Sequence, residues 1–129
     1  MSKLLSFLLL AIGAVVLVPA LRERAMPYVA PALDPFYSWS ARNRVSEIVD
    51  LLREEETLGR SIPAPRDFAS FVDRRDLKKG ASLDPWGTPF YLQLSRRTYL
   101  VGSAGKDRRP RTADDILSEP QPRKGAPSR

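Results

Sequence analysis

The chain has 129 residues and contains neither cysteine nor histidine. Its length allows one modest domain with attachments, and the two missing residue types exclude disulfides, thiol nucleophiles, histidine bases and Cys/His zinc sites. The net charge of +6, from 21 basic and 15 acidic residues, is too small for a dedicated nucleic-acid binder. No paired-carboxylate or glycine-rich phosphate motif stands out. We therefore expect a protein that is not an enzyme, with no small-molecule substrate and no specific nucleic acid partner.

The amino end carries a long apolar run. Leu4 to Leu21 is 18 residues without a charge, and as a helix it would reach about 27 Å, close to the ~30 Å hydrocarbon thickness of a bilayer. We predict a single-pass anchor over residues 1–24 in the inner (cytoplasmic) membrane, with the amino end cytoplasmic and the rest periplasmic. A cleaved secretory signal is the competing interpretation, with Val18 and Ala20 as the small residues before a cut.

Residues 25–39 combine prolines with aromatic side chains. Pro27, Pro31 and Pro35 each lack an amide hydrogen and disfavour helix at the preceding residue. We therefore predict a juxtamembrane linker in which the chain does not continue as one long helix. Its aromatic residues suit either a membrane interface or the cap of the following core, and they are Tyr28, Phe36, Tyr37 and Trp39.

Two helices are predicted next. In residues 40–58 an apolar stripe at i, i+3, i+4 and i+7 indicates an amphipathic helix, and Gly59 is placed to end it. The stripe consists of Val45, Ile48, Val49 and Leu52. Residues 67–75 indicate a short helix with Phe68, Phe71 and Val72 on one side.

The stretch "LDPWGTPFYLQLSRRTYLV" predicts a turn followed by a β-hairpin. Asp84, Pro85, Trp86 and Gly87 fit a turn, because Asp accepts from the backbone ahead, Pro presets φ and Gly suits the last place. Alternating apolar residues on both sides of Ser95-Arg96-Arg97 then indicate two strands. A helix packed on a small antiparallel β-sheet gives an α+β domain over residues 40–117.

"LDPWGTPFYL" followed by "YLVGSAGKDRRPRTADDI" resembles the carboxyl-terminal part of the major pseudopilin of type II secretion, the general secretion pathway protein G family. The resemblance covers roughly residues 40–116, and its specific motifs lie in 84–116. It implies a pseudopilin-like head and a role in protein transport as a structural subunit. The amino end differs from the family pattern: the first glutamate, Glu23, follows the apolar run, and no prepilin peptidase motif is present.

The resemblance also implies a calcium site in the loop after the hairpin. Its ligands would be Asp107 and Asp115, or its neighbour Asp114, with backbone carbonyls near Val101 and Ser103. Such mixed oxygen donors suit Ca²⁺.

The residues themselves also support an interpretation without metal. Thr112 and Asp115 have capping-box spacing and would open a short helical turn through Ile116 and Leu117, while Asp107 would pair with a nearby arginine. The basic residues of the loop would weaken cation binding.

Residues 118–129 are broken by prolines and basic, which is typical of a disordered tail; the tail is either solvated or touches acidic lipid or protein. Three functions follow. The first is a membrane-tethered assembly protein that contacts other subunits of a secretion or pilus-like machine. The second is an accessory subunit of another membrane complex that reuses this head. The third is a cleaved, soluble binding module.

Overall fold

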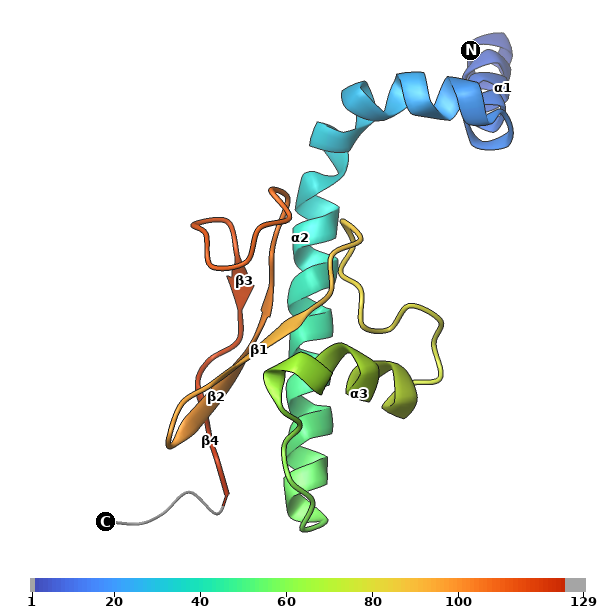
Figure 1. Cartoon of the computed structure of the whole chain (residues 1–129). Coiled ribbons are helices and arrows are strands. Elements are labelled where there is room, and N and C mark those ends of the chain that lie inside the picture. Colours follow the sequence, from blue (N-terminus) through green and yellow to red (C-terminus); the bar gives the residue numbers. More distant parts are fainter. Residues whose placement is uncertain (1, 125–129) are drawn as a thin grey trace. The chain divides into compact units, whose positions relative to one another are not determined.

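The computed structural model describes residues 2–124. Its elements run α1 (Ser2–Leu17), α2 (Pro19–Thr57), the 3₁₀ helix η1 (Pro65–Asp67), α3 (Phe68–Arg75), β1 (Tyr91–Leu94), β2 (Thr98–Ser103), β3 (Ile116–Leu117) and β4 (Gln121–Pro122) (Figure 1). Two compact units divide the chain, Met1–Pro35 and Phe36–Arg129, and α2 contributes to both. The α+β class with a small antiparallel sheet is confirmed.

The first unit contains the apolar run, which is divided between two helices at Val18. The break falls immediately before Pro19, where a proline disfavours helical geometry in the residue that precedes it. Within the described residues, no single helix has both the length and the apolar character needed to cross a bilayer. The helices Lys3–Leu17 and Pro19–Thr57 meet that requirement only together, as a pair bent by 111°.

The three prolines do not interrupt the helix. The prediction that the chain leaves helical geometry between residues 25 and 39 is wrong, because Pro27, Pro31 and Pro35 all lie inside α2. Their spacing of four residues puts the rings on one face of the helix, so the missing amides leave the rest of the ladder intact. All three are exposed, and water can solvate the carbonyls that lose a partner.

In the second unit, α2 buries the predicted stripe. Val45, Ile48, Val49 and Leu52 are all buried, together with Ala41. The helix ends as expected at Gly59, which has a φ of 75°. The amide of Arg60 donates to Glu55 O and that of Gly59 to Glu56 O, the paired bonds of a Schellman cap.

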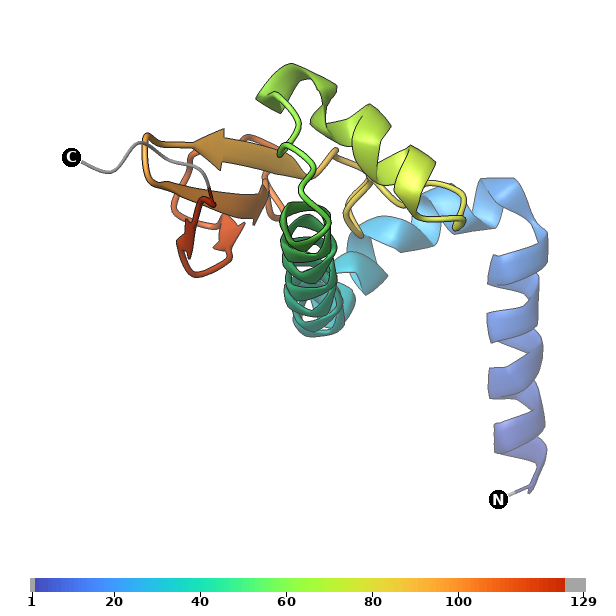
Figure 2. The same cartoon turned by 90° about the horizontal axis from the view of Figure 1, so that it is seen from below.

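The stripe packs on the hairpin and on α3. Strands β1 and β2 pair antiparallel, with Tyr91 opposite Gly102 and Leu94 opposite Tyr99. Figure 2 looks along the part of α2 that belongs to the second unit and shows the hairpin and α3 on the same side of it. The core between them contains the expected aromatic side chains of α3, and its members from outside α2 are Phe68, Phe71, Val72, Ala81, Phe90, Leu92, Tyr99 and Val101.

Two short strands extend the sheet beyond the predicted hairpin. β3 pairs with the end of β2, where Ser103 faces Ile116, and β4 pairs with its start, where Tyr99 faces Gln121. The prediction of a disordered tail is wrong for residues 118–124, because the exposed edge of β2 offers them a partner; the remainder of that tail, 125–129, lies outside the described residues.

Candidate functional site

The aspartate loop joins β2 to β3 and is closed at its base. The pair Ser103–Ile116 holds its two ends together. Just inside the base, the two arms come so close that a Cβ added to Gly105 would lie 2.3 Å from the carbonyl oxygen of Asp114. Gly105 also has a φ of 68°, so both the space and the backbone conformation require glycine.

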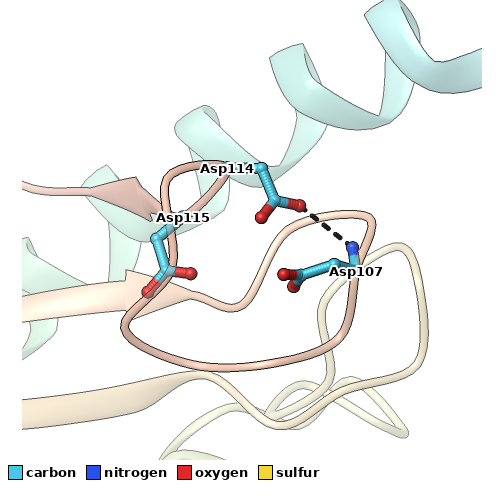
Figure 3. A group of neighbouring side chains, drawn as sticks. All are labelled: Asp107, Asp114 and Asp115. Atoms are coloured by element: carbon cyan, nitrogen blue, oxygen red, sulfur yellow. Dashed lines mark hydrogen bonds between the residues drawn. The ribbon is translucent and has the colours of Figure 1, made fainter.

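Three carboxylates converge inside this loop. One oxygen each from Asp107, Asp114 and Asp115 lies within 4.8 Å of the other two (Figure 3). Asp107 is exposed, and the other two are half-buried. The structure therefore brings together the three residues that the resemblance implied as ligands.

The hydroxyl of Thr112 is at the centre of this group. Its oxygen lies 2.7 Å from Asp114 Oδ1, 2.8 Å from Asp107 Oδ2, 3.1 Å from Asp115 Oδ1 and 3.1 Å from the Arg109 carbonyl. A threonine hydroxyl has one hydrogen, so it donates to one of these four oxygens at a time. The other three approach it with no proton between, which leaves a cluster of carboxylate and carbonyl oxygens that a cation would stabilise.

Backbone amides supply most of the positive charge that the carboxylates meet. Asp107 Oδ1 accepts from the amide of Arg109 at 2.8 Å and Asp114 Oδ2 from that of Asp107 at 3.0 Å. Asp115 accepts from the amides of Arg111 at 2.6 Å and Thr112 at 3.2 Å. No ion pair joins the three aspartates to a basic side chain anywhere in residues 2–124, so the expected arginine partner of Asp107 is not found.

The capping-box prediction is half right. The amide of Thr112 donates to Asp115, as in a capping box, and the Asp115 amide lies 3.3 Å from Thr112 O. The chain then enters β3 instead of a helical turn, because Ile116 pairs with Ser103 of β2. The helical turn through Ile116 and Leu117 is therefore wrong.

These contacts favour the ionised forms of Asp114 and Asp115. The amide of Asp107, followed by the Thr112 hydroxyl, lowers the pKa of Asp114 below its ordinary value. Burial opposes ionisation of Asp115, but the hydroxyl of Tyr91 and the amides of Arg111 and Thr112 outweigh it and lower its pKa as well.

Tyr91 contacts the candidate site, and the sequence patterns did not indicate it. Its hydroxyl donates to Asp115 Oδ2, and its ring lies across Gly102, where a Cβ would be 2.4 Å from Tyr91 Cζ. Burial, then the adjacent Asp115 carboxylate, raises the pKa of Tyr91 well above its ordinary range. Counting the register back from the turn at 95–97 would have placed Tyr91 opposite Gly102, but no signal in the sequence indicated that Asp115 would lie beside them.

The Asp-Pro-Trp-Gly turn supports the same loop through a buried serine. Asp84 Oδ1 accepts from the amides of Trp86 and Thr88, which forms the predicted turn. Its other oxygen accepts from the Ser103 hydroxyl at 2.7 Å, and that hydroxyl accepts from the Gly105 amide at 3.2 Å. Asp84 and Ser103 are both buried, so a rigid chain of contacts joins the turn to the base of the loop.

The other expected site residues lie around this framework. The Val101 carbonyl, an implied metal ligand, accepts from the Ser118 amide at 2.9 Å. Gly87 has the positive φ of 83° that its place after Pro85 and Trp86 requires. The Trp86 ring packs edge-on against the Tyr37 ring, with 5.9 Å between the ring centroids.

Comparison with protein-family models, with curated proteins and with solved structures finds no match to this chain.

Proposed function

We propose that the chain is a membrane-anchored, non-enzymatic assembly protein whose pseudopilin-like head lies outside the cytoplasmic membrane and contacts other subunits of a secretion or pilus-like machine. One observation carries the proposal: the resemblance motifs form a single connected unit. The Asp84 turn, the Ser103 hydroxyl and the aspartate loop are joined by consecutive hydrogen bonds, and the stripe of α2 packs against the hairpin between them.

The apolar run supports membrane attachment. Its large side chains are strongly exposed, Leu4 by 77% and Leu17 by 80%. A contiguous apolar surface of this kind needs lipid or protein to cover it. We propose the inner membrane as that cover, crossed once with the amino end in the cytoplasm; a cleaved signal remains the competing account of the same run.

The chemistry of the loop supports binding over catalysis. A general acid or base works best with a pKa near the working pH, whereas the pKa values of Asp114 and Asp115 are both lowered. Ionised carboxylates of this kind hold a cation or order a backbone well. They exchange protons poorly at neutral pH.

Calcium is the proposed occupant of the loop. The carboxylates of Asp107, Asp114 and Asp115 would hold it, with the Thr112 hydroxyl and the Arg109 carbonyl as neighbouring oxygen donors. Ca²⁺ takes six to eight oxygens and accepts irregular geometry. Bound there, the ion would neutralise the cluster and fix the loop in the shape that partner subunits meet.

Photo-crosslinking in native membranes tests the assembly role. A photoreactive residue would replace Asn43 on the exposed side of α2, with Arg96 in the hairpin turn as a second position. Crosslinks to other subunits of a secretion or pilus-like machine would support the proposal. Crosslinks to a different membrane complex would favour an accessory subunit, and a chain that crosslinks to no other protein would contradict both.

A further inference from the structure

One end of the second unit presents aromatic and cationic side chains together. Phe36 and Trp39 of α2 are 59% and 60% exposed, with ring centroids 6.0 Å apart. An open cavity of about 370 Å³ separates Phe36 and Tyr37 from the loop that carries Lys78 and Lys79. We call the surface formed by Phe36, Trp39, Lys78, Lys79 and Leu83 the aromatic–lysine patch.

The ammonium groups of Lys78 and Lys79 are exposed, although the Asp76 carboxylate lies near Lys78 and accepts from its amide at 3.0 Å. Arg44, which also lines the cavity, is held by Asp76 at 2.6 Å and by Glu47 at 2.7 Å. Lys78 and Lys79 are exposed, and within the described residues neither ammonium group forms an ion pair. The two lysines therefore offer exposed ammonium groups that no ion pair occupies within the described residues.

The apolar part of the patch is exposed beside these lysines. Leu83, which lines the cavity, is 46% exposed. Aromatic rings and lysines side by side match the interfacial region of a bilayer, where rings sit at headgroup level and ammonium groups meet lipid phosphates.

Chain connectivity makes a membrane surface available to this patch. Phe36 follows Leu21, the last residue of the apolar run, by 15 residues. Even fully extended, that stretch spans about 50 Å, so an anchored run holds the patch close to the bilayer. We infer that the aromatic–lysine patch docks on the headgroups of anionic lipids in the membrane that holds the anchor, an inference that rests on the proposed anchoring.

Reconstitution of the full chain into vesicles tests this docking. One set contains phosphatidylcholine alone and the other also contains phosphatidylglycerol, and both carry bromine on the acyl chains as a fluorescence quencher. The chain has two tryptophans, so the difference between the native chain and Trp39→Phe isolates the Trp39 signal. Each lysine that meets an anionic surface raises the affinity of the protein for that surface about fivefold.

We expect the native chain to float with both sets and its Trp39 emission to be quenched more strongly with phosphatidylglycerol. Lys78→Glu/Lys79→Glu should abolish that difference. Arg96→Glu/Arg97→Glu, which makes the same charge change in the hairpin turn, should retain it.

The outcomes separate the patch from the anchor. Flotation with both sets but equal quenching, or quenching that Lys78→Glu/Lys79→Glu leaves unchanged, overturns the docking and leaves the anchor standing. The chain could instead float only with the vesicles that contain phosphatidylglycerol, and Lys78→Glu/Lys79→Glu could abolish that flotation. This result would support the patch and contradict the anchor. No flotation with either set overturns both.

Discussion

Tyr91 lies across Gly102, its direct partner in the β1–β2 register, and reaches the aspartate loop only because that position has no side chain. A Cβ at Gly102 would meet the ring at 2.4 Å, far inside contact distance. The hairpin thereby extends one phenolic hydroxyl to Asp115 and connects the sheet directly to the candidate site.

Gly102→Ala should therefore displace the Tyr91 ring and break its bond to Asp115. We expect a loss of about 1–3 kcal/mol in the free energy of unfolding, as for other overpacked sites, measured by urea denaturation in detergent. Tyr91→Phe, which keeps the ring and removes the hydroxyl, should lose about 1 kcal/mol. Gly13→Ala, where an added Cβ meets nothing within 4 Å, is the matched control. A Gly102→Ala chain as stable as the control would contradict the packing.

The stability of the head should fall at both ends of the pH scale. Asp114 and Asp115 have lowered pKa values in the folded state, so their contribution is present above the unfolded value of about 3.9 and is lost as pH falls through the folded values. Tyr91 has a raised pKa. Its contribution is complete below about pH 10 and declines as pH rises toward the folded value.

The unfolding temperature measured across pH would test both losses of stability. Asp114→Asn should reduce the loss at acid pH, and Tyr91→Phe should reduce the loss at alkaline pH. If each variant retained the native profile, these groups would not be the source of the pH dependence.

Calcium should stabilise the full chain. At a concentration 100 times the dissociation constant, a ligand of the folded state adds about 2.7 kcal/mol to the free energy of unfolding, and loops outside cells bind calcium at about 10⁻⁴–10⁻³ M. We expect millimolar Ca²⁺ to raise the unfolding temperature and Mg²⁺ to do so less. Asp114→Asn should remove the effect.

Arg108→Gly should strengthen the calcium response. The substitution removes a positive charge from the loop, and the φ of 59° at Arg108 is a conformation that favours glycine. Isothermal titration calorimetry would measure the heat of calcium binding to the native chain and to this variant. If neither shows any heat of binding, the calcium proposal is rejected.

Glu55 should be among the most important single side chains for stability. It is buried, and its Oε1 accepts from Arg60 at 3.1 Å and from Arg75, which joins the end of α2 to α3. Glu55→Ala removes a buried acceptor from two arginines that water can solvate in part, because their side chains are 54% and 35% exposed, and it should cost about 1–3 kcal/mol. Glu54→Ala, at an exposed position on the same helix, should cost less than 1 kcal/mol. Equal losses in the two variants, measured by urea denaturation, would contradict this role.

Local patterns were sufficient for the core of the head. The stripe from Val45 to Leu52, the cap at Gly59 and the turn at Asp84 each depend on a few neighbouring residues, and the structure has all three. The convergence of Asp107, Asp114 and Asp115 was implied by the family resemblance and not by a local pattern.

Features that depend on distant partners could not be predicted in this way. β3 and β4 are two residues long and exist because β2 offers an edge. The neutralisation of the aspartates by backbone amides depends on the fold of the whole loop, which local spacing does not specify. The proline segment was misjudged for another reason: each proline disfavours helix, but three on one exposed face remove few bonds from a long helix.

Cysteine labelling tests the central claim, a head held outside the cytoplasmic membrane on a membrane anchor. Because the chain has no cysteine, Arg96→Cys in the head and Ser2→Cys at the amino end each introduce a single thiol. In bacterial spheroplasts, a membrane-impermeant maleimide should label Arg96→Cys at once and Ser2→Cys only after lysis, with both proteins retained in membranes after alkaline extraction. A head thiol that reacts only after lysis, or a chain released from the membrane by alkali, would contradict the account.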